Sequence, residues 1–333
     1  MSSDFLHGGA LDLVKKRFAD APRPWIDLST GINPWPFPDT QVSTDAYAHL
    51  PTQALYETCR KAMAHAIGVQ SETLILAPGS ELLIRLLPTV ISAKTIAILS
   101  PSYNDHVRVW QAAGRTVIET ADPLALAEHV DAIVICQPNN PDGRVFSSEK
   151  LEAAMAWLRP KSGWLIVDEA YVDLAPNLSV APQIDRGGLI VLRSFGKFFG
   201  LAGLRLGGLI APQSVLSAMR HRLGEWPVSG AALEIGARAY ADLEWQDQAR
   251  QALRKTRLAL DGVLAETGFK VTAGTDLFRY VETPGHAHSL WAHLADSGIY
   301  ARRFDWTQNH LRLGLPKDQN SIARLRTALT LSE

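Results

Sequence analysis

Lys197 is the last residue of the segment 193–197, whose composition suits covalent chemistry at a lysine, and Arg205 follows it eight residues later. Ser194 and Gly196 are small, so a phosphorylated cofactor can approach the Lys197 amine closely. Such an amine forms a Schiff base with a carbonyl group, and the Arg205 guanidinium could reach the phosphate. An isolated lysine is usually a solvated surface residue, but the apolar run before this one favours a catalytic role for Lys197.

An aspartate follows a second apolar run, residues 164–167, and Tyr171 comes three residues after it. A carboxylate at the end of a buried strand is costly unless it is paired. A protonated pyridine nitrogen is a suitable partner, because Asp168 would keep the ring cationic and therefore a strong electron sink. Tyr171 could donate a hydrogen bond to a phenolic oxygen of the same ring. Alternatively, Asp168 is a helix N-cap.

Three more polar segments follow apolar runs. The turn at residues 137–143 places the Asn140 amide where it could hold the phenolic oxygen from the other side. Gly79 and Ser80 precede an apolar helical pattern, and backbone amides at a helix N-terminus bind phosphate, although Ser80 could be a simple N-cap. Tyr103 offers a ring that could stack on a pyridine, or it could be a core aromatic residue.

The elements that must position these side chains alternate between strand and helix. Helical patterns such as 81–92 and 148–158 lie between apolar runs, which favours an α/β fold with a mostly parallel sheet covered on both faces. Ligands bind such sheets beyond the carboxyl ends of the strands, so the polar segments are expected to form one site. The predicted strands are 73–77, 95–99, 132–136, 164–167 and 189–192.

The character of the sequence changes after residue 212. A long helical stretch at 232–267 precedes strand-like segments at 269–272, 277–281 and 311–315, which predicts a smaller α+β domain. The proline-rich segment 22–38 cannot be a regular helix or a central strand and is expected to be an extended arm. We therefore predict an N-terminal arm (1–38), a large cofactor-binding domain (39–212) and a small C-terminal domain (213–333).

Composition restricts the class of protein. The 333 residues are 47% hydrophobic with a formal net charge of -1, which gives no support for a nucleic-acid or anionic-membrane partner. Cys59 and Cys136 are too few for a disulfide framework and lack metal-ligand spacing, so no metal site is expected, and Cys136 is predicted to be a small buried hydrophobic residue. Without a signal-peptide core or a long apolar stretch, the sequence predicts a cytoplasmic protein.

The order of the motifs resembles the fold-type I enzymes that depend on pyridoxal 5'-phosphate, specifically the histidinol-phosphate aminotransferase branch. The resemblance extends from about residue 26 to about residue 325. It implies that Lys197 carries the cofactor, Asp168 pairs with the ring nitrogen, and Arg312 receives the substrate carboxylate. The other cofactor-binding residues that it implies are Gly79, Ser80, Glu81, Tyr103, Asn140, Tyr171, Ser194 and Arg205.

The N-terminal sequence resembles the threonine-phosphate decarboxylases of cobalamin synthesis, through His7-Gly8-Gly9 and residues 25–34. This resemblance implies decarboxylation of L-threonine O-phosphate to aminopropanol phosphate. It also implies that His7, Gly8, Gly9, Asn33 and Arg302 bind the phosphorylated substrate, with Arg303 as a further candidate. Alternatively, His7 lies in a mobile tail, Asn33 is a turn residue, and the two arginines are surface charges.

Two positions depart from the pattern of those decarboxylases. Ala10 stands where an asparagine is common, and Leu50 stands where relatives place a tyrosine that can reach the cofactor phosphate of a partner subunit. The second departure removes one expected contact without affecting the fold. Relatives of this fold form homodimers, so a homodimer is expected here by resemblance.

Three other functions compete with decarboxylation. A histidinol-phosphate-type aminotransferase would use the same cofactor site. A protein that has lost catalysis and serves as an assembly partner would have no need to keep Lys197, Asp168, Asn140, Tyr171 and Arg205 together. A nucleotide-binding Rossmann protein lacks its main support, because no Gly-x-Gly-x-x-Gly follows the first predicted strand.

Overall fold

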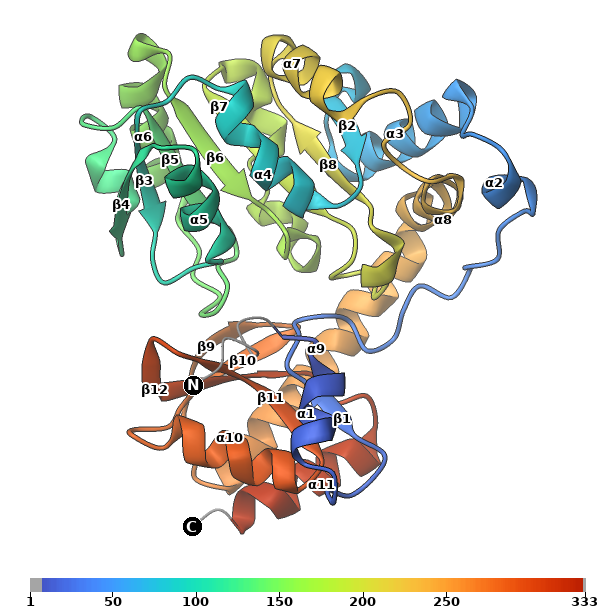
Figure 1. Cartoon of the computed structure of the whole chain (residues 1–333), viewed down its shortest axis with the longest axis vertical. Coiled ribbons are helices and arrows are strands. Elements are labelled where there is room, and N and C mark those ends of the chain that lie inside the picture. The colour runs from blue at the N-terminus through green and yellow to red at the C-terminus, as the bar shows by residue number, and fades with distance from the viewer. Residues whose placement is uncertain (1–7, 332–333) are drawn as a thin grey trace. The chain divides into compact units, whose positions relative to one another are not determined.

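The computed structural model describes residues 8–331, which divide into two compact units (Figure 1). One unit takes in the chain up to Pro36, the short segment Pro141–Gly143 and the chain from Gln246 onward. The other, larger unit comprises Phe37–Asn140 and Arg144–Trp245. Each unit is built around its own sheet.

The larger unit contains a seven-stranded sheet in the order β2-β8-β7-β6-β5-β3-β4. Neighbouring strands are parallel except around β8, which is antiparallel to both β2 and β7. The central strands are buried on both faces, as their continuous apolar sequences require. The strands are β2 (Leu74–Ala77), β3 (Thr95–Leu99), β4 (Thr116–Thr120), β5 (Ala132–Cys136), β6 (Trp164–Asp168), β7 (Leu189–Ser194) and β8 (Gly207–Ile210).

Helices bury the larger sheet. One hydrophobic cluster joins the sheet to α4, α5 and α7 through side chains such as Leu87, Trp110 and Met219, each at most 1% exposed. Helix α3 packs against α8 and β2, and α6 packs against β6. The helices of this unit are α2 (Asp45–Ala48), α3 (Gln53–Ile67), α4 (Ser80–Val90), α5 (Asp105–Ala112), α6 (Ser148–Leu158), α7 (Gln213–Leu223) and α8 (Gly230–Ala241).

The smaller unit has a five-stranded sheet in the order β1-β11-β12-β10-β9. Strand β1 (Ile26–Leu28) is a parallel edge strand beside β11, and the other pairs are antiparallel. The remaining elements are α1 (Leu11–Arg17), α9 (Leu243–Glu266, which belongs to this unit from Gln246 onward), β9 (Val271–Thr275), β10 (Phe278–Glu282), α10 (Ala287–Asp296), β11 (Ile299–Phe304), β12 (Thr307–Gly314) and α11 (Gln319–Thr330).

The segment Pro141–Gly143 is a short excursion of the chain into the smaller unit. Gly143 has φ +70°, and a Cβ there would lie 2.2 Å from the carbonyl oxygen of Gly274 in β9. Only glycine allows this close approach of two backbones. Asn140, one of the expected cofactor-binding residues, directly precedes the excursion.

The observed boundaries differ from the sequence prediction in three places. Residues 213–245 cluster with the larger unit, so the division falls at Gln246 and not at 213. The expected single helix at 232–267 is wrong, because the chain breaks at Asp242 between α8 and α9. The N-terminal segment contains α1 and the edge strand β1, and it clusters with the smaller unit as part of its fold.

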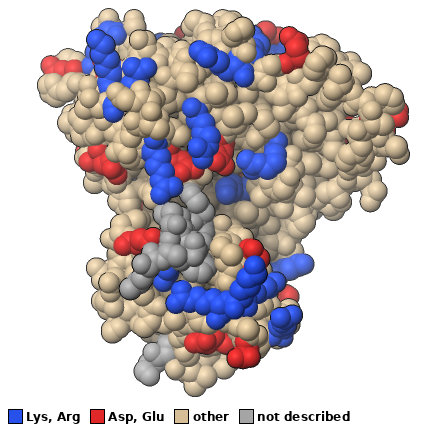
Figure 2. Space-filling model, viewed as in Figure 1, with Lys and Arg blue, Asp and Glu red and all other residues tan. Residues whose placement is uncertain are grey.

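Surface charge agrees with the near-zero net charge. The face shown in Figure 2 carries both Lys or Arg and Asp or Glu side chains on each unit. Among the described residues, no helix is both long enough and apolar enough to cross a bilayer.

Candidate active site

A pocket of about 130 Å³ lies in the larger unit, at the carboxyl ends of its parallel strands. It collects side chains from segments up to 125 positions apart in sequence, from Ser80 to Arg205. The residues that line it are Ser80, Glu81, Ile84, Tyr103, Cys136, Pro138, Asn140, Asp168, Ala170, Tyr171, Ser194, Gly196, Lys197, Ala202 and Arg205. The structure therefore brings together nearly all the residues that the sequence indicated for the cofactor; Gly79 lies beside Arg205.

Tight packing fixes the segment that carries Lys197. A Cβ on Gly196 would lie 2.7 Å from the Cα of Ala202, so the chain before and after the lysine is closely apposed. Phe195 and Phe199 are fully buried and stack with their ring centroids 4.4 Å apart, and Phe199 also stacks on Trp245. This aromatic cluster holds the turn that presents the amine to the pocket.

The start of α4 and Arg205 form a cradle for an anion. Gly79 precedes the helix with φ +88° and provides no side chain to cap its amides. A Cβ there would lie 2.7 Å from Arg205 Nη2, and a Cβ on Gly207 would lie 2.6 Å from the amide nitrogen of Ser80. Uncapped amides at a helix N-terminus beside a guanidinium suit a phosphate group.

We expect Gly79→Ala to weaken binding of a phosphorylated cofactor by about tenfold or more. The added methyl group would displace the Arg205 guanidinium, and the positive φ would strain the backbone. Fluorescence titration of the cofactor-free protein measures the change. Gly203→Ala is the matched control, since an added Cβ at that position meets nothing within 4 Å. Equal affinities for the two variants would contradict the cradle.

Asp168 ends β6 with its carboxylate facing the pocket. Its Oδ1 accepts a hydrogen bond from the Ala170 amide at 3.1 Å, and its Oδ2 lies 3.0 Å from His106 Nε2. His106 is 1% exposed and belongs to α5. Sequence reasoning did not single out His106; its position three residues after Tyr103, one helical turn away, was the available signal.

Burial is the largest single influence on His106 and lowers its pKa, but hydrogen bonding and electrostatic interactions with Asp168 and Cys136 together raise the pKa of the imidazole from 6.5 to about 10. A histidine that donates to Asp168 Oδ2 fixes the orientation of the carboxylate. His106 is therefore a positioning residue for the group that would face the cofactor ring.

A raised pKa makes the contribution of His106 to stability depend on pH. The contribution is fully present below pH 6.5 and is lost as the pH rises towards 10, by at most about 1.4 kcal/mol per pH unit. We expect the difference in unfolding free energy between the cofactor-free protein and its His106→Asn variant to shrink across this range. Urea unfolding at several pH values measures it, and a difference independent of pH would contradict a protonated His106.

Cys136 is 4% exposed, as the sequence predicted, but it also lines the pocket. Its Sγ lies 3.1 Å from Ser102 Oγ and 4.0 Å from Asp168 Oδ2. Within residues 8–331, His106, Cys136 and Asp168 form the one group whose atoms are close enough to ligate a metal. The hydrogen bond between His106 Nε2 and Asp168 Oδ2 already explains why these two atoms lie close together without a metal ion.

Glu169 faces away from Asp168, as alternation along an extended chain requires. It is fully buried, and its Oε2 lies 3.0 Å from Arg193 Nη1, while Arg193 Nη2 also pairs with Asp173. Glu169 Oε1 accepts from the Val180 amide at 2.7 Å. This buried ion network ties the ends of β6 and β7 together, and so fixes the strand ends that carry Asp168 and Ser194.

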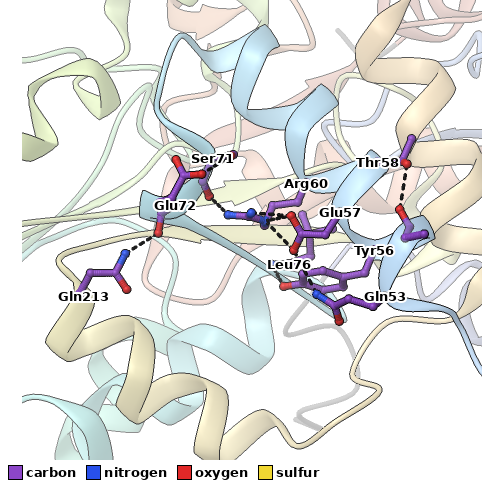
Figure 3. Close-up of polar contacts among 10 residues, drawn as sticks. Gln53, Tyr56, Glu57, Thr58, Arg60, Ser71, Glu72, Leu76 and Gln213 are labelled. Carbon is purple, nitrogen blue, oxygen red and sulfur yellow. Dashed lines mark hydrogen bonds and ion pairs between the residues drawn. The ribbon is translucent and has the colours of Figure 1, made fainter.

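A larger cavity of about 780 Å³ lies in the same unit, beside α3 and the end of α7. Several of its polar groups are hydrogen-bonded to one another or to nearby backbone (Figure 3): Arg60 pairs with Glu57 and the Ser71 carbonyl, and Tyr56 Oη accepts from the Leu76 amide at 2.9 Å. These bonds connect α3 to β2 and its preceding turn. The smaller pocket, which contains Lys197 and Asp168, is the candidate active site.

The smaller unit provides two arginines on adjacent strands. Arg302 of β11 and Arg312 of β12 lie opposite each other in the antiparallel register, so their side chains share one face of the sheet. Burial, followed by the charge of Arg312, lowers the pKa of Arg302 to about 10. Arg312 is 5% exposed, and its Nη2 donates to the Ser29 carbonyl at 2.9 Å. Two positive charges held this close favour binding of an anion.

The other expected substrate-binding residues differ in what the structure shows. The Gly9 amide donates to Ser29 Oγ at 2.9 Å. Asn33 is 3% exposed and its Oδ1 accepts from the Trp35 amide at 2.9 Å, which is the turn contact considered as the alternative. The Arg303 guanidinium lies over the Trp291 ring at 4.5 Å. His7 lies outside the described residues.

A mostly parallel sheet with a lysine, an aspartate and an anion cradle at its strand ends defines the α/β class of the aminotransferase fold. The sequence model of the aminotransferase class I and II family matches residues 23–329. The chain therefore belongs to the class I and II aminotransferase family.

Two curated relatives carry the name threonine-phosphate decarboxylase. The one from Sinorhizobium sp is 39% identical over 100% of both chains, and the one from Pseudomonas aeruginosa is 38% identical over 97% of this chain and 96% of its own. The histidinol-phosphate aminotransferase of Microcystis aeruginosa is 28% identical over 91% of this chain and 90% of its own. The chain is thus more similar to the named decarboxylases than to these aminotransferases.

Solved structures agree on the fold. Histidinol-phosphate aminotransferase from Sinorhizobium meliloti, in complex with pyridoxal-5'-phosphate, has a TM-score of 0.83 at 19% identity, covering 96% of this chain and 93% of its own. L-threonine-O-3-phosphate decarboxylase from Porphyromonas gingivalis has a TM-score of 0.75 at 18% identity, covering 91% and 98%. At these identities the likeness concerns the fold alone.

Proposed function

We propose that this chain is an enzyme that decarboxylates L-threonine O-phosphate with pyridoxal 5'-phosphate as cofactor, and that its product, aminopropanol phosphate, enters cobalamin synthesis. The structural observation that carries the proposal is the pocket that gathers Lys197, Asp168 and Arg205 at the strand ends. The identity of 38–39% to two named threonine-phosphate decarboxylases supports the choice of reaction.

The pocket residues fit this cofactor. The α4 amides, Ser80 and Arg205 would hold its phosphate, and the crowding of a Cβ at Gly79 supports a backbone cradle there. Asn140 and Tyr171 would contact its phenolic oxygen, and the ring of Tyr103 would lie against the pyridine. Glu81 also lines the pocket, but its Oε1 accepts from Arg85 Nη2 at 2.9 Å. When bound, the cofactor supplies an electron sink for the bonding pair released at the substrate Cα.

Residues of the chain would supply the proton transfers and the covalent attachment of the cofactor. With the cofactor bound, the Asp168 carboxylate, oriented by His106, would hold a proton on the ring nitrogen. The Lys197 amine would hold the cofactor covalently and would return a proton to the substrate Cα. In the net reaction the Cα–carboxylate bond breaks, carbon dioxide leaves, and a Cα–H bond forms, so no oxidant or amino acceptor is needed.

The smaller unit provides groups for the anionic ends of the substrate. Arg312 suits a carboxylate, because its planar guanidinium can donate two parallel hydrogen bonds. Arg302 lies opposite it and adds a second positive charge, as a substrate with both a carboxylate and a phosphate requires. Roles for Gly8, Gly9 and Asn33 in substrate binding belong to the same proposal.

The test is a paired assay on the purified, cofactor-loaded protein. We expect carbon dioxide and aminopropanol phosphate to form from L-threonine O-phosphate without any keto acid. A protein that releases no carbon dioxide, yet transfers an amino group from histidinol phosphate to a keto acid, would be an aminotransferase and would refute the proposal. Sedimentation analysis would test the expected homodimer, and cell fractionation would test the expected cytoplasmic location.

A further inference from the structure

Ser29 connects the N-terminal segment to the sheet of the smaller unit. It is 0% exposed and follows β1 directly. Its hydroxyl donates to Asp27 Oδ1 at 2.7 Å and accepts from the Gly9 amide at 2.9 Å, while its own amide donates to the same Asp27 oxygen at 2.9 Å. One buried side chain thus fixes both the turn after β1 and the backbone at Gly9.

The carbonyl of Ser29 accepts the hydrogen bond from Arg312 Nη2. A Cβ on Gly8 would lie only 2.3 Å from this carbonyl oxygen, so the N-terminal backbone packs directly against the group that aims the guanidinium. Tyr300, which is 1% exposed, lies close to Ser29 and to the Ala10 backbone; burial raises the pKa of its phenol, and these two neighbours lower it in part. The position of the N-terminal segment and the aim of Arg312 therefore depend on the same residue.

The far end of this segment is held independently. Phe18, just after α1, packs edge to face on Trp291 with centroids 5.7 Å apart, and the Arg17 guanidinium lies 5.8 Å from that ring. The Ser29 hydroxyl is thus one of the contacts that hold the start of α1, while Trp291 packs at its end.

We propose that Ser29 is a positioning residue for substrate binding, which holds the Gly8–Gly9 backbone against β1 and thereby sets the aim of Arg312. The proposal rests on the proposed function for the identity of the substrate. Ser29 touches no reacting atom, so its loss acts on the binding of the anion and leaves the chemical step unchanged.

The experiment uses the cofactor-loaded full chain and compares three variants. Ser29→Ala removes the hydroxyl, and Gly8→Ala forces the backbone away from the Ser29 carbonyl. Ser321→Ala is the matched control, because the Ser321 hydroxyl and amide both donate to Asp318 Oδ1, at 2.8 Å each, in the same pattern as Ser29 and Asp27. That control lies at the start of α11 in the same unit.

We expect Ser29→Ala and Gly8→Ala to raise the KM for L-threonine O-phosphate about five- to tenfold, with kcat within about twofold of the wild type. The affinity for inorganic phosphate, measured by calorimetry, should fall by a similar factor. Trypsin should cleave after the exposed residues Lys15 and Lys16 several times faster in both variants. Ser321→Ala should behave as the wild type in all three measurements.

Several results would overturn the proposal: no binding of phosphate by the wild type, unchanged phosphate affinity in both variants, or unchanged tryptic cleavage. A fall in kcat without a rise in KM would also overturn it. Failure of the proposed function would look different, because a wild type inactive towards L-threonine O-phosphate would still show the phosphate and trypsin differences.

Discussion

Lys197→Ala is expected to lower the decarboxylation rate by about 10⁴-fold or more, because no other described residue lining the pocket carries an amine that could bind the cofactor covalently. The visible absorbance of the lysine-bound cofactor should also be lost. The phosphate cradle should still retain some cofactor, since Gly79 and Arg205 are unchanged. Carbon dioxide release and an absorbance spectrum measure the two effects together.

Lys161→Ala provides a control for the lysine substitution. The Lys161 amine donates to the carbonyls of Ala127 and Glu128 at 2.8 Å each, so this variant also loses an ordered ammonium group in the larger unit. It should keep both the absorbance and the activity. A Lys197→Ala protein that still releases carbon dioxide at a tenth of the wild-type rate would assign the chemistry to another residue.

Asp168→Asn is expected to slow decarboxylation by about 10²- to 10³-fold while leaving the fold intact. The amide keeps the size of the side chain and can still accept a hydrogen bond from His106, but it has no charge to hold a proton on the cofactor ring. The effect should therefore appear in kcat more than in cofactor affinity. Steady-state kinetics and cofactor titration separate the two.

Asp131→Asn tests whether the loss of charge at a half-buried aspartate beside another strand of the sheet would give the same result. Asp131 precedes β5 at the amino ends of the parallel strands, away from the pocket. Its Oδ2 accepts hydrogen bonds from the amides of Lys94 and Thr95 at 2.8 and 2.9 Å. Loss of its charge should affect stability and leave kcat unchanged. Equal losses of kcat in the two variants would show that Asp168 acts only through the fold.

The sequence was most informative where strands are buried on both faces. Continuous apolar runs predicted β3 and β5 with their observed bounds, and β2, β6 and β7 to within two residues at each end. The side chains that follow these strands meet at one edge because the strands are parallel. The pocket was predictable for this reason.

Elements without that apolar signal were missed. Strand β8 begins with Gly207 and Gly208, whose small size is needed because Cβ atoms there would meet Ser80 and Met63 at 2.6 Å. Strand β4 is a sheet edge with an exposed pattern, and it was missed as well. His106 was missed because its spacing from Tyr103 is a weak signal, and its partner Asp168 lies 62 positions away on β6.

The orientation of the Arg312 side chain could not be predicted from the sequence either. The sequence marked the arginine, but the residue that orients it lies 283 positions away, and the contact is made by a backbone carbonyl. A carbonyl has no sequence signature. Only the register of β1 against β11 brings Ser29 to the position where it can act.

The excursion at Pro141–Gly143 gives the chain two extra crossings between the units, in addition to those at residues 36–37 and 245–246. Asn140 is therefore joined by a single peptide bond to a segment that packs on β9. Thermodynamic linkage makes such a connection reciprocal: an anion that shifts this segment on binding would change the affinity of the pocket for its cofactor, and the cofactor would change the affinity for the anion by the same factor. The close contact between Gly143 and Gly274 would then determine how strongly the binding of one ligand changes the affinity for the other.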